Sequence, residues 1–187
     1  KGSHLYSTAS IYEALKVAKE ILNGEISYEF LIKEIELILP QIKNSIYENF
    51  IENDLLKRSI NCGKPDISVL SVCVPFNVLE HNEEVLKNTV NVIEKELKVE
   101  NGGYLRYKDD IYIGGNAWII SSLWLALYYI KSNEIEKAQN LYDWVTNHAD
   151  DKGFLPEQID RYTGKTAWIT QLSWSHALYI IVGNLLK

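Results

Sequence analysis

The sequence lacks methionine altogether and contains only two cysteines among its 187 residues. A chain without an initiator methionine is expected to have been processed or to be part of a longer chain. Two thiols are too few for a disulfide framework, so we expect Cys62 and Cys73 to be free. Cys73 lies among apolar neighbours, which favours a buried position.

Long hydrophobic runs and clusters of basic residues are also missing. No apolar run approaches the roughly 20 residues that span a bilayer, and the run at 69–76 is short and broken by Pro75. The net charge is −6, and no stripe of Lys and Arg is present, which argues against binding to nucleic acid. We therefore expect neither a membrane nor a nucleic acid as a partner.

The usual signatures of bound metals and nucleotides are absent from the sequence as well. The paired glycines lack the Lys and the strand context of a phosphate-binding loop. The histidines are scattered without the spacing of metal ligands; they are His4, His81, His148 and His176. We predict no cofactor and no metal.

What the sequence does have is a helical pattern over nearly its whole length. With 47% hydrophobic and 24% charged residues, it has the composition of a globular protein, and its length suits one domain over residues 1–187. Apolar residues recur at helical spacing in seven segments. These are 7–22, 27–50 (kinked or divided by Pro40), 66–76, 82–97, 116–132, 133–149 and 170–187. The predicted fold class is all-α, and the segment 116–132, apolar on nearly every side, is predicted to be an inner helix.

Several residues at the predicted helix starts are good capping residues. Ser7 or Thr8 is expected to cap the first helix, and Asn82 the fourth. Asn133 with Glu136 has the spacing of a capping box for the sixth helix.

Two long aromatic loops precede the helices that carry tryptophan. They cover 102–116 ("GGYLRYKDDIYIGGN") and 153–169 ("GFLPEQIDRYTGKTAWI"). Each contains Gly–aromatic–Leu followed soon by a charged residue. Long loops in a compact domain are usually functional or disordered, and these contain few residues that favour disorder. We interpret both as functional.

The first loop combines residues that suit a sugar: Arg106, Tyr107, Asp109, Asp110 and Tyr112. Arg and Asp in fixed geometry can form paired hydrogen bonds with vicinal hydroxyls, and Tyr offers a flat apolar face with a polar tip. The alternative is a structural loop in which Arg106 pairs with Asp109 or Asp110.

The second loop presents Glu157 directly after Pro156. The proline biases Leu155 toward extended geometry, so the carboxylate would point in a fixed direction. Such a carboxylate could act as a general base on water. The alternative is an ordinary solvated glutamate on an exposed loop.

Two tryptophans lie beside these loops, near the first turns of their predicted helices. Trp118 and Trp174 are therefore candidates for stacking on a sugar ring, whereas Trp124 sits at apolar helical spacing and is assigned to the core.

Together these segments resemble glycoside hydrolase family 15, the glucoamylase family. Residues 102–130 are similar to its motif G-x-x-R-Y…D-x-Y-x-G-N-x-W, with Ala117 in place of the usual proline. Residues 153–180 are similar to its block P/S-E-Q-x-D…L-x-W-S-x-A. Weaker similarity at 4–16 and 65–79 extends the resemblance over nearly the whole chain.

The resemblance implies a partial (α/α)6 barrel, with about seven of twelve helices. It further implies an inverting hydrolase that releases glucose from the non-reducing ends of α-glucosides. Glu157 would be the general base, and Gln158 would help to orient it. The residues that would bind the sugar are Arg106, Tyr107, Asp110, Tyr112, Trp118, Gln158 and Trp174.

The general acid of the family lies just upstream of the segment matched by residues 4–16, and these residues do not include it. We expect the missing N-terminal part of the same protein, or a second copy, to supply it, so that this chain alone has little activity. The same partner is expected to help cover the apolar helix at 116–132. Two alternatives stay open: a non-catalytic helical-toroid protein with a binding or structural role, or a same-family enzyme acting on trehalose or α-1,6-glucans.

Overall fold

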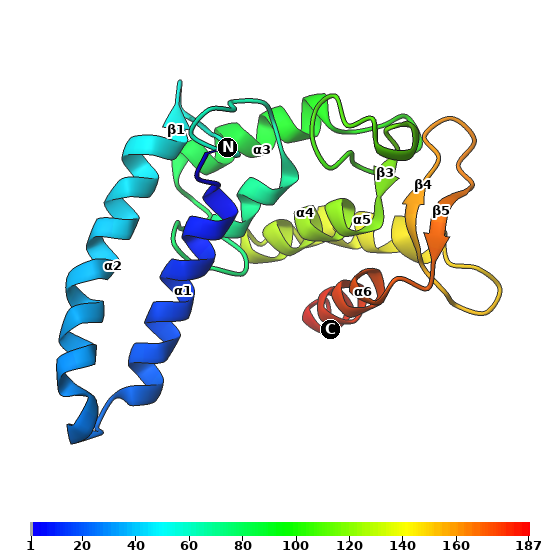
Figure 1. The fold of residues 1–187 in the computed structure, drawn as a ribbon. Helices are drawn as coiled ribbons and strands as arrows, with labels where there is room; N and C mark the ends of the chain where they lie inside the picture. The colour runs from blue at the N-terminus through cyan, green and yellow to red at the C-terminus, as the bar shows by residue number, and fades with distance from the viewer. Residues whose placement is uncertain (1) are drawn as a thin grey trace.

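The computed structural model describes residues 2–187, which form six α-helices, three short 3-10 helices (η) and two small sheets (Figure 1). The helices are α1 (Leu5–Leu22), η1 (Ile26–Tyr28), α2 (Glu29–Phe50), η2 (Ile67–Val72), α3 (Glu84–Glu96), η3 (Tyr112–Gly114), α4 (Ile119–Lys131), α5 (Ile135–Thr146) and α6 (Ser173–Leu185). The strands are β1 (Ile51–Glu52), β2 (Leu55–Leu56), β3 (Ala117–Trp118), β4 (Pro156–Ile159) and β5 (Thr166–Thr170). The predicted helical class is confirmed, and η2 accounts for the seventh predicted helix.

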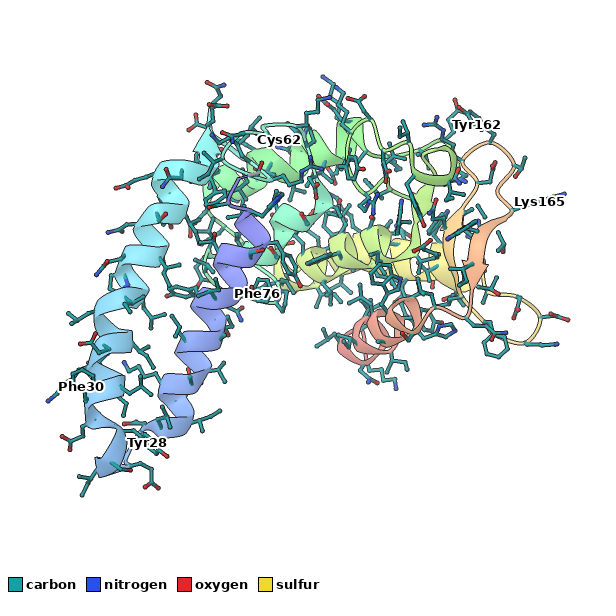
Figure 2. All side chains as sticks on the ribbon, viewed as in Figure 1. Tyr28, Phe30, Cys62, Phe76, Tyr162 and Lys165 are labelled. Carbon is teal, nitrogen blue, oxygen red and sulfur yellow. The ribbon has the colours of Figure 1, made fainter. Side chains whose placement is uncertain are left out.

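Helices α1 and α2 form a hairpin that extends away from the rest of the molecule (Figure 1). Leu5 and Ala9 are buried near the start of α1, and Ile46 and Phe50 near the end of α2. At the other end of the hairpin, Phe30 is 76% exposed; Figure 2 shows it beside the connection between the two helices. The hairpin is therefore anchored to the body at one end. Pro40 lies inside α2 without dividing it.

Helix α4 is the centre of the hydrophobic core. Leu123, Leu125 and Ala126 have no exposed surface, and the helix packs against α5, α6, η2 and β4. The prediction of an inner helix is confirmed. These elements already cover most of α4, but its face with Ile120 and Trp124 is partly exposed and lines an apolar cavity, so cover from outside this chain stays a prediction for that face. The exposed apolar residues lie mainly on α1, α2 and α6.

A three-stranded antiparallel sheet, β3–β4–β5, lies at the far side of the body from the hairpin (Figure 1). Ala117 pairs with Ile159, Trp118 with Gln158, and Pro156 with Thr170. These residues were predicted to lie in loops and at helix starts. Strands of two to five residues are too short to show the alternation that identifies a strand in a sequence.

The predicted caps of two helices are wrong. Helix α1 begins at Leu5 with His4 at the N-cap, so Ser7 and Thr8 lie inside it. Thr8 instead donates its hydroxyl to the carbonyl of His4 at 3.1 Å. Helix α3 has Glu83, rather than Asn82, at its N-cap. Both helices begin without a side-chain capping bond, because tertiary contacts determine where they start.

The predicted capping box at Asn133 is also wrong, because Asn133 closes α4 instead of opening α5. Its backbone is left-handed, with φ of 63°. Its N–H donates to Ile130, and the N–H of Glu134 donates to Tyr129. These two bonds form a Schellman motif, in which asparagine tolerates the left-handed position.

The two cysteines are free, as predicted, and Cys73 is buried. Burial raises the pKa of the Cys73 thiol to about 11, so this group stays protonated at neutral pH. Within residues 2–187, every helix is too short or too polar to traverse a lipid bilayer.

Candidate active site

Arg106 and Asp110 form a two-pronged ion pair inside the first aromatic loop. Nε of Arg106 donates to Oδ2 of Asp110 at 3.1 Å, and Nη2 donates to Oδ1 at 3.2 Å. The Asp110 side chain has no exposed surface, and its Oδ1 also accepts the backbone N–H of Tyr112 at 3.0 Å. A buried carboxylate with three donors is held in one orientation. Both groups are therefore fixed before any ligand arrives.

Asp109 is not part of this pair. Its carboxylate accepts the ammonium of Lys64 at 2.6 Å, and both side chains are largely exposed. This hydrogen bond, together with the positive charge of Lys64, lowers the pKa of Asp109. Of the two partners that the sequence left open for Arg106, the structure selects Asp110.

Three aromatic rings surround the Arg106 guanidinium. Its Cζ lies 4.3 Å from the ring centroid of Trp118, 4.9 Å from Tyr107 and 5.7 Å from Tyr112. The guanidinium of Arg58 also lies 4.9 Å from the Tyr107 ring. Such cation–π contacts strengthen when water is excluded. Tyr107 thus supports Arg106 directly, in addition to its expected part in binding sugar.

The backbone of the first loop is tied to the segment that leads into η2. The N–H of Ile67 donates to the carbonyl of Arg106 at 2.9 Å, and the N–H of Lys108 donates to Pro65 at 3.1 Å. Asp66 caps η2 by accepting the N–H of Ser68 at 2.8 Å. The position of Arg106 is therefore set by hydrogen bonds on both sides, which is unusual for a residue in a long loop.

Glu157 lies on β4, the central strand of the small sheet, and is only 7% exposed. Its expected place on an exposed loop is wrong, because the residues after Pro156 pair with strands on both sides. The amide of Gln158 donates to Oε2 of Glu157 at 3.3 Å, so these neighbouring side chains are in contact. A buried carboxylate is far less common than a solvated one, which weakens the alternative of an ordinary loop glutamate.

The sheet register connects Glu157 with the arginine cluster. Gln158 pairs with Trp118, and the Trp118 ring lies over Arg106. Trp118 is on β3 rather than in the first helical turn, and it is almost fully buried. Nε1 of Trp118 and Oε1 of Gln158 are buried without a hydrogen-bond partner within residues 2–187. Buried polar atoms are normally paired, so these two atoms are exceptions, and both lie within the candidate site.

Helix α6 anchors the start of β4. The hydroxyl of Ser175 donates to the carbonyl of Pro156 at 3.1 Å, and the N–H of Leu155 donates to Nε2 of His176 at 3.1 Å. Nδ1 of His176 lies 2.9 Å from the carbonyl of Leu172, so the ring carries its proton on Nδ1. This anchoring role of Ser175 and His176 was not predicted from the sequence. Their position next to Trp174 was the one available signal.

Trp174 lies in the first turn of α6, as predicted, and its ring centroid is 6.5 Å from that of Trp118. It also lines an apolar cavity of about 390 Å³ together with residues of α1 and α4, including Tyr6 and Trp124. The structure thus brings together all eight predicted site residues in one region, through the first loop, the sheet and the start of α6.

Comparison with known proteins agrees with this geometry. Residues 129–184 match the family "Glycosyl hydrolases family 15". An uncharacterized glycosyl hydrolase of Methanocaldococcus jannaschii is 32% identical over 96% of this chain and 32% of its own length. The isomaltose glucohydrolase of Kribbella flavida is 27% identical over 80% of this chain and 41% of its own length.

Solved structures give the same architecture. A glycosidase variant in complex with glucose superimposes with a TM-score of 0.87 at 21% identity, over 99% of this chain and 52% of its own. A family 15 glucoamylase from Hypocrea jecorina gives 0.72 at 16% identity, over 99% of this chain and 42% of its own. The fold is therefore part of an (α/α)6 toroid of the glycosidase class. The chain belongs to glycosyl hydrolase family 15 and spans about half the length, or less, of the relatives that it matches.

Proposed function

We propose that the complete protein hydrolyses α-glucosides from their non-reducing ends with inversion, and that Glu157 is its general base. The observation that carries this proposal is the buried carboxylate of Glu157 on the central strand. The next residue, Gln158, is paired with Trp118 in the sheet register. A general base must be held in place and kept from bulk solvent to activate one water molecule. Packing, Gln158 and the anchor from α6 do this for Glu157.

The remaining residues are suited to hold the terminal glucose. Arg106 is partly exposed and is held by the buried Asp110, so it offers charged donors in fixed geometry, and the exposed Trp174 offers an apolar face. Inversion needs a second carboxyl group about 6.5–9.5 Å from the base. We assign that general acid to a segment of the barrel outside these residues.

The relatives suggest a short list of glucosides as substrates. An isomaltose glucohydrolase and two trehalases are among them. Isomaltose, trehalose and maltose are therefore the substrates to compare. A non-catalytic toroid is the second candidate, and the same assay separates the two.

The first prediction is that Glu157→Gln in the complete protein lowers kcat on the best of these substrates by about 10²–10⁴-fold, since the amide cannot accept a proton from water. Proton NMR at early times should show that the wild type releases the non-reducing glucosyl unit of isomaltose or maltose as β-glucose, whereas trehalose should give β-glucose from that unit and α-glucose from the leaving sugar. Glu136→Gln, an exposed change on α5, is the matched control and should leave kcat unaltered. A loss under about tenfold, or release of the non-reducing glucosyl unit as α-glucose, contradicts the proposal. A wild type without activity on all three sugars would favour the non-catalytic alternative.

A further inference from the structure

The pairing of β4 with β5 contains a bulge opposite Glu157. Pro156 pairs with Thr170 and Gln158 with Ala167, so one residue on β4 faces two residues on β5. The two are Trp168 and Ile169. Bulges re-aim side chains and are common next to active sites. The bulge that accommodates Glu157 therefore also sets the direction of the Trp168 side chain.

Trp168 has a backbone conformation that its side chain disfavours. Its φ is +65°, in the left-handed region, where glycine usually occupies the first position of such a bulge. Among residues 2–187, the other large hydrophobic residue with a positive φ is Ile113, which directly follows Tyr112. The indole of Trp168 is 59% exposed, so burial does little to offset this strain. Strain of this kind is typical of functional sites.

The indole extends the aromatic cluster outward. Its centroid lies 6.4 Å from the Tyr112 ring in a T-shaped arrangement, and Tyr112 lies 5.8 Å from Trp118. Along this row, Trp118 is buried, Tyr112 is half-exposed and Trp168 is more exposed still. The charged pair of Arg106 and Asp110 lies at the buried end.

We propose that Trp168 is a specificity-determining residue that stacks on the second sugar of the substrate, the one that leaves. This inference rests on the proposed function and extends it. The charged and hydrogen-bonding groups at the buried end suit the terminal glucose. An exposed indole offers a flat apolar face without charge, which suits a neutral sugar ring farther from the base. The strained backbone holds the indole beside Tyr112, at the exposed end of the row.

The test compares substrates that differ only in the leaving group. α-Glucosyl fluoride has no second sugar, whereas isomaltose, trehalose and maltose do. Trp168→Gly in the complete protein should lower kcat/KM for the best disaccharide by about tenfold and alter that for the fluoride by less than about twofold. Trp168→Phe keeps a ring and should retain most of the activity on the disaccharide.

Glycine adopts this φ freely, so Trp168→Gly should also unfold at the same temperature as the wild type or a higher one. Equal losses on the fluoride and the disaccharide would overturn the inference, because they would indicate a role in holding Glu157 or in packing. Unchanged disaccharide kinetics would overturn it as well. If the wild type hydrolyses none of these substrates, both this inference and the proposed function fail. If Glu157→Gln abolishes hydrolysis while Trp168→Gly preserves the substrate ratio, only this inference fails.

Discussion

Arg106 shows how the free protein prepares its site at the scale of single residues. Two guanidinium nitrogens are engaged by Asp110, and the face of the group lies on Trp118. Lysine has a charge but lacks the planar fork and the flat face that these contacts need. The site thus depends on shape as well as charge.

We therefore predict that Arg106→Lys lowers kcat/KM of the complete protein by roughly 10–100-fold, mainly by raising KM. It should also reduce the free energy of unfolding by about 1–3 kcal/mol, since the buried Asp110 loses a well-placed donor. Steady-state kinetics and urea unfolding measure the two effects.

The matched control is Lys64→Ala, which removes the exposed partner of Asp109 from the same region. An exposed ion pair contributes little, so both measurements should stay near wild type. Similar losses in the two variants would show that general loop stability, and not the Arg106 geometry, sets the kinetics.

At the scale of elements, the turn at Gly115 holds the first loop in its shape. Gly115 has φ of 70°, and a Cβ added there would collide with the carbonyl oxygen of Asp110. Gly164, in the turn between β4 and β5, has nearly the same φ of 68° but open space around it. The two glycines therefore separate backbone strain from collision.

Gly115→Ala is predicted to lower both Tm and kcat/KM, because Asp110 must move and Arg106 moves with it. Gly164→Ala should lower the free energy of unfolding by only the backbone strain of about 1–2 kcal/mol, with a correspondingly small fall in Tm, and leave the kinetics nearly unchanged. Thermal unfolding and kinetics on the same substrate provide the comparison. Equal kinetic losses in both variants would contradict a specific coupling of Gly115 to Asp110.

The turn that joins β4 to β5 is closed by Asp160. Its Oδ1 accepts the N–H of Thr163 at 2.7 Å, the hydroxyl of Thr163 at 2.9 Å and the N–H of Tyr162 at 3.0 Å. These bonds, led by those from Thr163, hold the pKa of Asp160 below its ordinary value of 3.8. A lowered pKa means that the carboxylate stabilises the fold above pH 3.8 and that this stabilisation is lost as the pH falls through the lower, folded value.

Asp160→Ala is therefore predicted to lower Tm by a few degrees at pH 7, with the difference from wild type shrinking on acidification below the ordinary pKa. Differential scanning calorimetry across this range measures it. Asp151→Ala, another exposed aspartate in a turn, should show no comparable difference. A gap in Tm that is constant with pH would mean that the charge of Asp160 is not responsible.

The helices could be predicted from the sequence because each presents several turns of apolar residues at regular spacing. Helix starts were harder: Asn133 fits a capping box by type and spacing, but the chain uses it to leave α4. The candidate site residues were proposed from the motif resemblance, whereas the burial of Glu157 was not predicted. Its burial depends on pairing with β3, almost forty residues earlier in the chain, and no local pattern reports that.

At the scale of the whole molecule, apolar residues remain exposed on faces of α1, α2 and α6. Exposed residues on α1 and α2 include Ile21, Phe30 and Leu37, and those on α6 include Ile180 and Ile181. Soluble monomers rarely expose large contiguous apolar patches. In the solved relatives, the part of the chain that this one does not cover amounts to about half the structure. We propose that this part covers these faces in the complete protein.

A sample of these 187 residues alone is accordingly predicted to self-associate, as measured by light scattering. Ile181→Glu should reduce the association because it charges the apolar face of α6. Asn140→Glu adds the same charge on an exposed part of α5 and should not. A folded, monodisperse monomer would show that these faces are stable in water without a partner.

The hairpin of α1 and α2 is anchored at one end, and this divides the molecule into regions of unequal local stability. Backbone amides near Phe30 can exchange with deuterium after a small local opening that breaks few packed contacts. Amides of β4 lie between two strands, and the start of β4 is bonded to α6, so their exchange requires much of the body to open. The strand that carries Glu157 should therefore retain its protons longest, and the hairpin tip should lose them first until a partner covers it.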